Sequence, residues 1–412
     1  MKETVLIYTD CYIYGGSERL MGSLFRNEIV NQEYSFRYVY RNHKLYKNGL
    51  KKEYSANELI AFKGINVISF DTLFYQINRF RLPKIVRNGM KIPFWIISKL
   101  GICDLYNFFV QYCFVRRLNP DIVHINNGGY PAARTCRTMV FAAWLAGCRS
   151  IVFQVNNQAL KPKTKLEGFI DKMINKRVAY FITASKLAKK NLAQNRKFPE
   201  HKIILVPNTV PEETVTKGRE EICTAMNISI EQFLMTEVAF LEKRKGQVLL
   251  IRAMEILKES SFDIYNKLCL LIVGSGIDRE KLEAIVNKKE MQNHIKFVGY
   301  CPDSINYIAA SDLFILPSIE NEDMPLVILT AMKLGKTIIS TDFAGIREEI
   351  EDGVSGILLS PNEITLPNDL ANAIIQVYNG VSLGKEAKLR FQSMFSSEIY
   401  GLKIKDIYKS LK

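Results

Sequence analysis

The sequence lacks the residue patterns that mark several large classes of protein. Its eight cysteines are scattered and include no Cys-x-x-Cys pair, which argues against a disulfide scaffold, a cysteine-rich zinc site and a dithiol redox site. It contains no internal repeat of fixed period and no low-complexity tract, so a solenoid and a disordered linker are not expected. These absences favour an ordinary globular protein of a reducing compartment.

Long hydrophobic runs are also missing. The apolar run nearest the N-terminus, residues 5–8, is too short for the core of a secretory signal and instead predicts a first β-strand. The apolar stretch 92–115 is interrupted by Lys99, Asp104 and two amide residues, so it does not predict a transmembrane helix, although an amphipathic surface helix stays open. We therefore expect a cytoplasmic protein, with peripheral contact to the inner face of the cytoplasmic membrane left open.

The sequence does contain enough apolar material for two domains. Its 412 residues are 48% hydrophobic, which fits two domains of roughly 200 residues, each with its own core. Strand-like runs alternate with segments of helical period along the chain, a pattern typical of βαβ units and parallel sheets. The expected strands are 5–8, 122–125, 151–155, 180–183, 235–241, 269–273, 294–298, 313–316 and 337–340.

The segment 207–211, which contains two prolines and an asparagine, separates two such series of strands and is the predicted domain boundary. We therefore predict an α/β protein with a Rossmann-like domain at 1–208, a second one at 209–395 and a C-terminal helix within 396–412. Two doubly wound domains of this kind would face each other across a cleft, where α/β proteins usually bind ligands.

The net charge of +14 is unevenly distributed. Residues 1–210 contain 33 Lys and Arg against 13 Asp and Glu, a balance of +20, whereas the remaining residues contain 23 against 29, a balance of −6. This asymmetry suggests an anionic partner for the first half, although a solvated basic surface explains it equally well. Residues 74–117 mix aromatic and basic side chains, which suits an anionic membrane interface as well as core packing. No nucleic-acid-binding motif accompanies the charge, so nucleic acid is not an expected partner.

The most informative segment, residues 311–356, predicts a strand, an acidic loop, a helix and a second strand. Glu322 lies in the loop, and Pro325, Leu326 and Val327 begin the helix. The free amides of a helix N-terminus form a ready anion site. The segment therefore predicts a carboxylate beside anion-binding amides.

Three other turns carry glycine or basic residues. Gly15 and Gly16 begin a helix after the first strand, where they would let a phosphate approach the backbone amides or simply form a tight turn. Gly274 begins a Gly-Ser-Gly turn that lacks the third glycine of a dinucleotide fingerprint. Arg244 and Lys245 belong to a Lys-Arg-Lys cluster before a helix, which can hold a pyrophosphate or be a solvated basic turn.

Together these motifs resemble the retaining nucleotide-sugar glycosyltransferases of family 4, which have the GT-B fold. The segment PSIENEDMPLVILTAMKLGKTIISTD has the family's Pro-Ser, glutamate, Ala-Met, Gly-Lys and Asp elements, and GGSERL is similar to its Gly-Gly-Ala-Glu-Arg signature. The resemblance covers nearly the whole chain and is most specific in 235–360. It implies transfer of a sugar from a UDP- or GDP-linked donor to a hydroxyl group, with retention of configuration, by a front-face displacement in which the departing diphosphate helps to take the acceptor proton.

The resemblance also implies roles for individual residues. The implied catalytic residues are Glu322, which would orient the sugar, and Lys245, which would hold the diphosphate. The implied donor-binding residues are Gly15, Gly16, Arg244, Gly274, Tyr300, Pro325, Leu326, Val327 and Thr330. Asn126 and Asn156 would lie near the acceptor or the sugar. No metal or resident cofactor is implied, because the Asp-x-Asp pair of metal-dependent glycosyltransferases is absent and cationic side chains with helix N-termini would replace the ion.

Three positions depart from the family pattern. Thr330 stands where the family has a second glutamate, Phe240 where it has an arginine, and Asn156 where many members have a histidine. A hydroxyl replaces charge-assisted hydrogen bonds at the first position, so we expect nucleotide binding to be weaker by about 1–3 kcal/mol. Arg244 is our hypothesis for a substitute of the missing arginine. The departures leave open a non-catalytic nucleotide- or glycan-binding subunit, and a sugar-nucleotide epimerase, on the same fold.

The expected function is therefore that of a metal-independent, hexosyltransferase-type glycosyltransferase (EC 2.4). By the resemblance, its acceptor would be a saccharide or a lipid-linked saccharide, in the synthesis of bacterial cell-surface polysaccharide such as capsule or lipopolysaccharide. Glu320 and Asp323, on either side of the expected catalytic glutamate, are interpreted as solvated loop residues. His124 lies inside an apolar strand and is interpreted as a core histidine.

Overall fold

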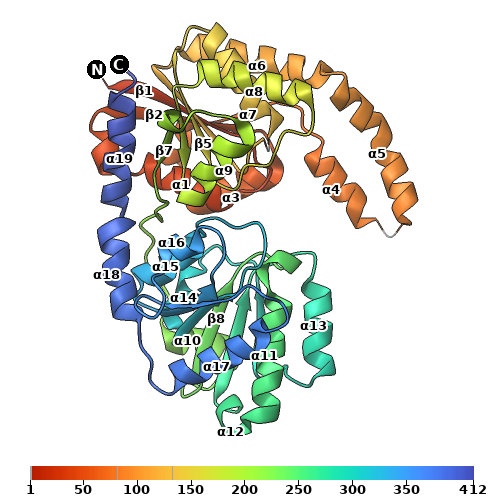
Figure 1. The fold of residues 1–412 in the computed structure, drawn as a ribbon, viewed down its shortest axis with the longest axis vertical. Helices are drawn as coiled ribbons and strands as arrows, with labels where there is room; N and C mark the ends of the chain where they lie inside the picture. The colour runs from red at the N-terminus through yellow and green to blue at the C-terminus, as the bar shows by residue number, and fades with distance from the viewer. Residues whose placement is uncertain (1, 81, 132) are drawn as a thin grey trace. The chain divides into compact units, whose positions relative to one another are not determined.

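The structure, a computed structural model, describes residues 2–80, 82–131 and 133–412, which form two compact units (Figure 1). The first unit comprises Met1–Thr183, Ala188–Val206 and Gly401–Lys412, and the second comprises Ala184–Leu187 and Pro207–Tyr400. Each unit contains one parallel sheet that is covered by helices, which confirms the predicted α/β architecture. Arg81, one of the basic residues of the stretch 74–117, lies outside the described residues.

The sheet of the first unit has the strand order β3-β2-β1-β4-β5-β6-β7. Its strands are β1 (Glu3–Thr9), β2 (Tyr34–Arg41), β3 (Phe62–Ile65), β4 (Ile122–Asn127), β5 (Ser150–Val155), β6 (Tyr180–Thr183) and β7 (Ile203–Leu205). All residues of β4 are buried, as expected for a parallel strand covered on both faces. The strand order reverses between β1 and β4, so their carboxyl ends flank the switch point where doubly wound sheets bind ligands.

The helices of the first unit follow and cover these strands. They are α1 (Gly16–Phe25), α2 (Glu28–Asn31), α3 (Lys44–Glu53), α4 (Asp71–Arg79), α5 (Lys84–Lys99), α6 (Ile102–Leu118), α7 (Arg134–Leu145), α8 (Lys165–Arg177), α9 (Lys186–Arg196) and the last part of α19 (Ser397–Lys409). The Tyr408 hydroxyl of α19 lies 2.7 Å from His124 Nδ1, and His124 Nε2 donates to Gln154 Oε1 at 3.1 Å. Burial lowers the pKa of His124 to about 4, so this neutral imidazole is the expected core histidine.

The sheet of the second unit has the order β10-β9-β8-β11-β12-β13 and reverses between β8 and β11. Its strands are β8 (Phe233–Val238), β9 (Leu268–Val273), β10 (Ile295–Gly299), β11 (Leu313–Leu316), β12 (Thr337–Thr341) and β13 (Ile357–Leu359). Its helices are α10 (Arg219–Met226), α11 (Gln247–Ser260), α12 (Phe262–Tyr265), α13 (Arg279–Lys288), α14 (Ile305–Ala310), α15 (Leu326–Lys333), α16 (Ile346–Glu349), α17 (Leu366–Tyr378) and α18 (Gly384–Met394).

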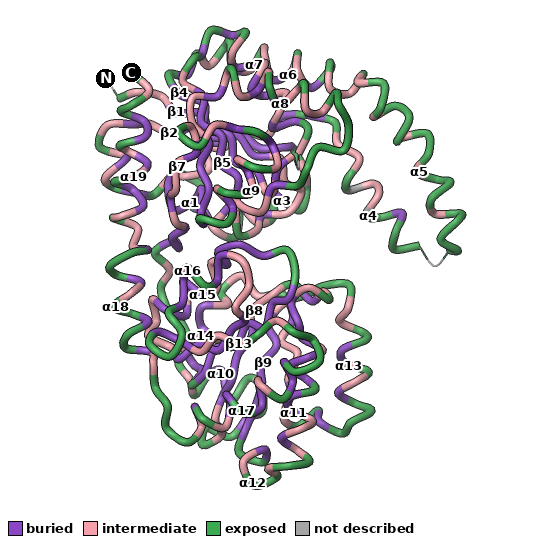
Figure 2. The backbone as a smooth tube through the Cα atoms, viewed as in Figure 1, coloured by how far each residue is buried: buried purple, intermediate pink, exposed green. Residues whose placement is uncertain are grey.

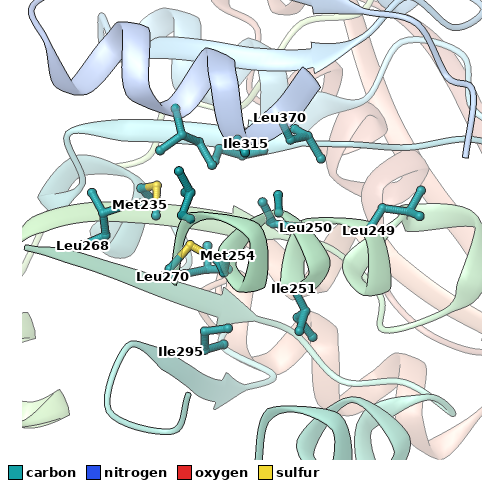
Figure 3. Close-up of a cluster of buried hydrophobic side chains, with 14 of the residues drawn as sticks. Met235, Leu249, Leu250, Ile251, Met254, Leu268, Leu270, Ile295, Ile315 and Leu370 are labelled. Atoms are coloured by element: carbon teal, nitrogen blue, oxygen red, sulfur yellow. The ribbon is translucent and has the colours of Figure 1, made fainter. Parts of the chain in front are cut away.

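Two apolar clusters sandwich this second sheet. On one face, Leu250 of α11 and Leu370 of α17 pack with strand residues such as Leu270 and Ile315 (Figure 3). On the other face, α15 and α18 pack against the strands through a second buried cluster that includes Leu329. The inner strands are accordingly buried and the edge strands β10 and β13 are partly buried, whereas helix surfaces alternate between buried and exposed residues (Figure 2). This packing fixes the loops at the carboxyl ends of β8 and β11.

Several elements differ from the sequence prediction. Strands β2, β3, β7 and β13 were not predicted, and β8 ends at Val238 rather than at Leu241. Beyond Val238 the backbone turns into the loop, where the Leu241 amide donates to the Ser275 carbonyl at 3.0 Å. The apolar stretch 92–115 is divided between α5 and α6, and Gly101 joins them with a φ of +73°. In the described part of the chain, no helix is both long and apolar enough to span a bilayer.

Candidate functional site

The second unit carries a charged cluster at the switch point between β8 and β11. Lys245 ends a short 3-10 helix, Lys243–Lys245, in the loop after β8, and Glu322 lies in the loop after β11. Lys245 Nζ forms an ion pair and hydrogen bond with Glu322 Oε2, and both side chains are nearly buried, with residue exposures of 7% and 9%. Two residues separated by 77 positions are thus joined at the edge where parallel strands end.

Neighbouring groups hold this ion pair in place. Ser318 Oγ donates to Glu322 Oε2 at 3.2 Å, and Arg244 Nη1 lies 3.6 Å from the same oxygen. Arg244 also binds the loop after β11, where its Nη1 donates to the Asn321 carbonyl at 3.1 Å, and its Nε donates to Glu242 of its own loop at 2.7 Å. Two cations therefore converge on one carboxylate, which is the arrangement required to bind an anion once that carboxylate is displaced.

Close backbone packing explains two glycines near this cluster, one in the loop after β8 and one in the loop after β9. Gly246 has a φ of +76°, and a Cβ atom there would lie 2.1 Å from the Pro317 carbonyl oxygen. Gly274, after β9, has a φ of +149°, and a Cβ atom there would lie 1.9 Å from the Ala239 carbonyl oxygen. Both glycines are therefore demanded by the fold, so Gly274 needs no ligand to explain it.

The N-terminus of α15 lies directly after the Glu322 loop. Pro325 is its N-cap residue, and within the described residues no side chain caps the helix, so no cap competes for the amides of Leu326 and Val327, which were predicted to bind an anion. Thr330 Oγ1 donates to the Leu326 carbonyl at 3.0 Å. The Thr330 hydroxyl was expected to hydrogen-bond a nucleotide, but its proton is already donated within the helix. Thr330 can therefore only accept a hydrogen bond from a ligand.

Tyr300, a predicted donor-binding residue, and Phe240, a departure from the family pattern, both have exposed side chains. Tyr300 follows β10, the edge strand of the sheet, and is 53% exposed. Phe240, the position without the family's arginine, is 46% exposed in the loop after β8.

Asp323 was interpreted as a solvated residue, and this is wrong because it is only 2% exposed and accepts a hydrogen bond from Ser185 Oγ. Glu320 is exposed, as expected.

The first unit carries a polar network at its own switch point, between β1 and β4. Glu18, in the first turn of α1, accepts hydrogen bonds from Thr9 Oγ1 at 3.0 Å, from Ser17 Oγ at 2.8 Å and from the Gly15 amide at 3.3 Å. The Gly15 amide therefore already has an acceptor. Gly15 has a φ of −132°, and a Cβ atom on Gly16 would meet nothing within 4 Å. The fold does not require glycine at either position, so the space beside them is available to a ligand.

The two predicted asparagines lie together in this network. Asn156 Nδ2 donates to Asn126 Oδ1 at 2.6 Å and to the Asn127 carbonyl at 2.8 Å. Gln154 Nε2 donates to Asn156 Oδ1 at 2.9 Å. The network thus links the carboxyl ends of β4 and β5 to α1, and it contains amides and hydroxyls that suit hydrogen bonding to a sugar. Among the residues placed by the structure, no group of three or more His, Cys, Asp and Glu side chains could hold a metal.

The comparisons with known proteins agree with this arrangement. Residues 219–390 match the family model of glycosyl transferases group 1. The HepE protein of Anabaena, in a crystal structure with UDP, has a TM-score of 0.72 at 16% identity, with complete coverage of both chains. The chain has the GT-B fold.

Two relatives in sequence extend this result. An uncharacterized glycosyltransferase of Methanocaldococcus jannaschii is 27% identical over 326 residues, which are 75% of this chain and 81% of the relative. The amylovoran biosynthesis glycosyltransferase AmsK of Erwinia amylovora is 28% identical over 172 residues, which are 39% of this chain and 41% of the relative. The family model matches the second unit, and both of these relatives are named as glycosyltransferases.

The structure of this GT-B protein also reveals two buried carboxyl groups that the sequence analysis missed. Glu237 is fully buried in β8 and accepts a hydrogen bond from Gln247 Nε2 at 2.9 Å. Glu349, at the end of α16, is also fully buried, and neither of its carboxyl oxygens has a hydrogen-bond partner among the described residues. Burial raises the pKa of Glu349 well above its ordinary value, and the carboxylates of Glu322 and Asp323 raise it further. The sequence signals Glu237 as a single acidic residue inside an apolar run, whereas Glu349 lies in the charged segment 347–352 and carries no such signal.

Glu237 should make the free energy of unfolding depend on pH. Burial raises the pKa of Glu237 to about 8, although Lys245 and the hydrogen bond from Gln247 lower it. Between its ordinary value of 4.5 and about 8, the folded chain holds a proton that the unfolded chain has lost. The free energy of unfolding therefore falls as pH rises through this window. For one group the slope is about 1.4 kcal/mol per pH unit, or roughly 2 kcal/mol between about pH 6 and about pH 7.5.

Glu237→Gln should flatten this part of the stability profile, measured by denaturant unfolding at several pH values. Exposed Glu231 supplies the matched control, since Glu231→Gln should leave the slope unchanged. An unchanged slope in Glu237→Gln would show that this carboxyl is ionised in the folded protein at neutral pH.

Proposed function

We propose that this protein transfers a sugar from a nucleoside diphosphate sugar to a hydroxyl group of a saccharide or lipid-linked saccharide, with retention of configuration and without a metal ion. The observation that carries the proposal is the nearly buried Lys245–Glu322 pair at the β8/β11 switch point, joined by Arg244. A site with two cations around one displaceable carboxylate, next to the open N-terminus of α15, suits a diphosphate and a sugar side by side.

In the proposed reaction the second unit binds the donor. Lys245 and Arg244 bind the diphosphate and, with the amides of Leu326 and Val327, stabilise the charge that grows on it as the sugar leaves. Glu322, released from Lys245, accepts hydrogen bonds from the sugar and orients it. The glycosidic bond to the diphosphate breaks, a bond from the anomeric carbon to the acceptor oxygen forms on the same face, and the proton of the acceptor hydroxyl passes to the departing diphosphate.

The first unit supplies the proposed acceptor side. The open space at Gly16 is left to the donor diphosphate, whereas Asn126 and Asn156 present amide groups at the carboxyl ends of β4 and β5. These uncharged groups can bind sugar hydroxyls, but none of them can act as a general acid or base. The acceptor proton is therefore assigned to the diphosphate rather than to a residue of this unit.

The names of similar proteins indicate the donor and the process. The Anabaena neighbour has been crystallised with UDP and with UDP-glucose, which favours UDP as the nucleotide to test first. The Erwinia relative acts in amylovoran biosynthesis according to its name, so we place the chain in the synthesis of a bacterial surface polysaccharide.

The proposal is tested by calorimetric titration with UDP, GDP and their sugar conjugates in EDTA, followed by assays of nucleotide release. Glu322→Gln should keep or increase UDP affinity, because Lys245 no longer has a competing carboxylate. Turnover should nevertheless fall roughly 10²-fold, because the group that orients the sugar is lost. Retention is checked by NMR of the anomeric proton of the product.

Glu320→Gln is the matched control, since Glu320 lies in the same loop but is exposed. It should leave both affinity and turnover unchanged. Full turnover in Glu322→Gln, or an equal loss in Glu320→Gln, would remove Glu322 from the proposed mechanism.

A second candidate is a non-catalytic subunit that binds a nucleotide or a glycan. It is favoured by Thr330, whose hydroxyl proton is used inside α15, and by exposed Phe240 in place of an arginine. This candidate predicts UDP binding without turnover on any acceptor tried. Release of free sugar or nucleotide from the conjugate by the wild-type chain, abolished in Glu322→Gln, would exclude it.

A further inference from the structure

Helix α5 stands apart from the rest of the first unit in its exposure. None of its described residues is buried, and together with α4 it extends away from the sheet (Figures 1 and 2). Ile85, Ile92 and Ile96 are 85%, 54% and 48% exposed. At 3.6 residues per turn, their spacing places them on one face of the helix. The helix therefore presents an apolar stripe to solvent along its length.

A second exposed apolar stripe lies on the first half of α6, the helix that follows α5. Ile102, Leu105 and Phe109 are each more than half exposed and share one face of α6. The opposite face of α6 is buried in the unit through Asn107, Gln111 and Val115. We call the combined surface of Ile85, Ile92, Ile96, Leu100, Leu105 and Phe109 the α5–α6 apolar face.

Positive charge accompanies this face. Between Asp71 and Asp104 the sequence has six Lys and Arg and no Asp or Glu. On α5, Arg87 and Lys91 lie on the side away from the isoleucines and donate to the Asn78 carbonyl at 2.6 Å and to Asn78 Oδ1 at 2.5 Å, which ties α5 to α4. Exposed Lys84 and Lys99 instead lie within about 100° of the isoleucines around the helix, so along α5 the α5–α6 apolar face is bordered by these two basic residues and by no acidic ones.

Two residues at the border have the character of an interfacial anchor. Trp95 is 55% exposed, and the Lys99 ammonium lies 4.7 Å from the centre of its ring. A tryptophan and a lysine at the edge of an apolar helix face suit the boundary between acyl chains and headgroups.

The sequence of α5 is also poorly suited to a helix that stands alone in water. Pro93 lies inside it and removes the hydrogen bond to the Gly89 carbonyl, and glycine itself disfavours the helix. A helix of this length with no buried face gains little from packing. Burial of its apolar stripe against a partner would supply the missing stabilisation.

We propose that the α5–α6 apolar face docks the protein on an anionic lipid bilayer, with α5 lying in the plane of the interface. The bilayer accounts for both the apolar stripe and the cationic border of α5. A second copy of the chain would bring two sets of uncompensated basic residues together, which opposes self-association through this face. The inference does not depend on the proposed transferase activity.

The test uses the full chain with Trp144→Phe, which leaves Trp95 as the only tryptophan. The protein is mixed with vesicles of phosphatidylglycerol and phosphatidylcholine, or of phosphatidylcholine alone, and separated by flotation. We expect binding to the anionic vesicles, weakened by salt, with a blue shift of Trp95 emission. Ile92→Asp combined with Ile96→Asp should reduce the partition coefficient at least tenfold.

The matched control is Ile277→Asp combined with Ile364→Asp, two isoleucines of the second unit that are 73% and 84% exposed. It should bind vesicles like the parent, and both double variants should keep the parent's UDP affinity and unfolding midpoint. Flotation without a shift of Trp95 emission would assign membrane binding to another surface. Absence of flotation, or a dimer in solution that Ile92→Asp with Ile96→Asp dissociates, would overturn the proposal.

Discussion

Replacing Lys245 by alanine is expected to reduce nucleotide-sugar turnover by roughly 10³-fold and UDP affinity by at least about tenfold. Lys245 is 7% exposed and lies at the β8/β11 switch point, where its ammonium is paired with Glu322. A cation in such a water-poor site stabilises the leaving diphosphate far more than a cation in solvent does. The loss should therefore be larger in turnover than in ground-state binding, because charge on the diphosphate grows as the sugar departs.

Lys243 provides the matched control in the same short helix. Its side chain is 69% exposed and lies 3.5 Å from Glu363 on the surface, so Lys243→Ala should change turnover less than about twofold. Since Lys245→Ala leaves Glu322 without its main partner, the unfolding midpoint is measured for both variants. Equal losses of turnover in the two variants would show that the effect comes from the general positive charge of this surface. Full turnover in Lys245→Ala would reject the proposed donor site.

The proposal is specific because substitutions of the two members of the ion pair are expected to change UDP affinity in opposite directions. Lys245→Ala should weaken UDP binding, whereas Glu322→Gln should preserve or strengthen it while turnover falls. A pair with a purely structural role would instead give similar losses of stability from either side, with no difference between binding and turnover. The contrast is accessible by titration alone, before any acceptor is known.

The sequence was sufficient to predict the parts of the site that depend on local order along the chain. Glu322 and the α15 amides lie where they do because strand β11 is followed by a loop and then by α15. Lys245 likewise lies in the loop between strand β8 and α11. The two loops lie near each other because the carboxyl ends of adjacent parallel strands meet at one edge of the sheet. The site roles themselves stay predictions until the variants are measured.

The residues that the sequence analysis missed depend on contacts between distant segments. Strand β2 contains Arg37 and Arg41 and does not resemble a buried strand, yet the Arg41 guanidinium lies 2.8 Å from Asp10 in the loop after β1 and is 5% exposed. Glu237 lies in an apolar strand and Glu349 in a charged segment, and only the fold shows that both are fully buried. The hydrophobic periodicity of a sequence predicts which face of a helix or strand is buried. It does not predict which polar residues on that face will have a buried partner from a distant segment.

Replacing Gly246 by alanine is expected to destabilise the second unit by about 4 kcal/mol, or roughly 10 °C in its unfolding midpoint. Two effects add at this position. Its φ of +76° is unfavourable for any residue with a Cβ atom, which costs about 1–2 kcal/mol. In addition, the new Cβ atom would lie 2.1 Å from the Pro317 carbonyl oxygen, so the loop after β8 or the loop after β11 must move.

Gly353→Ala separates the two effects, because Gly353 has a φ of +72° but a Cβ atom added there would meet nothing within 4 Å. This variant should lose only the conformational part, about 1 kcal/mol, and should keep its UDP affinity. Gly246→Ala should lose affinity as well, since the displaced loops carry Lys245 and Glu322. Thermal unfolding and UDP titration of both variants are the measurements. Equal destabilisation would show that the contact with Pro317 is relieved without cost, and normal UDP affinity in Gly246→Ala would show that the close packing of these loops does not position the ion pair.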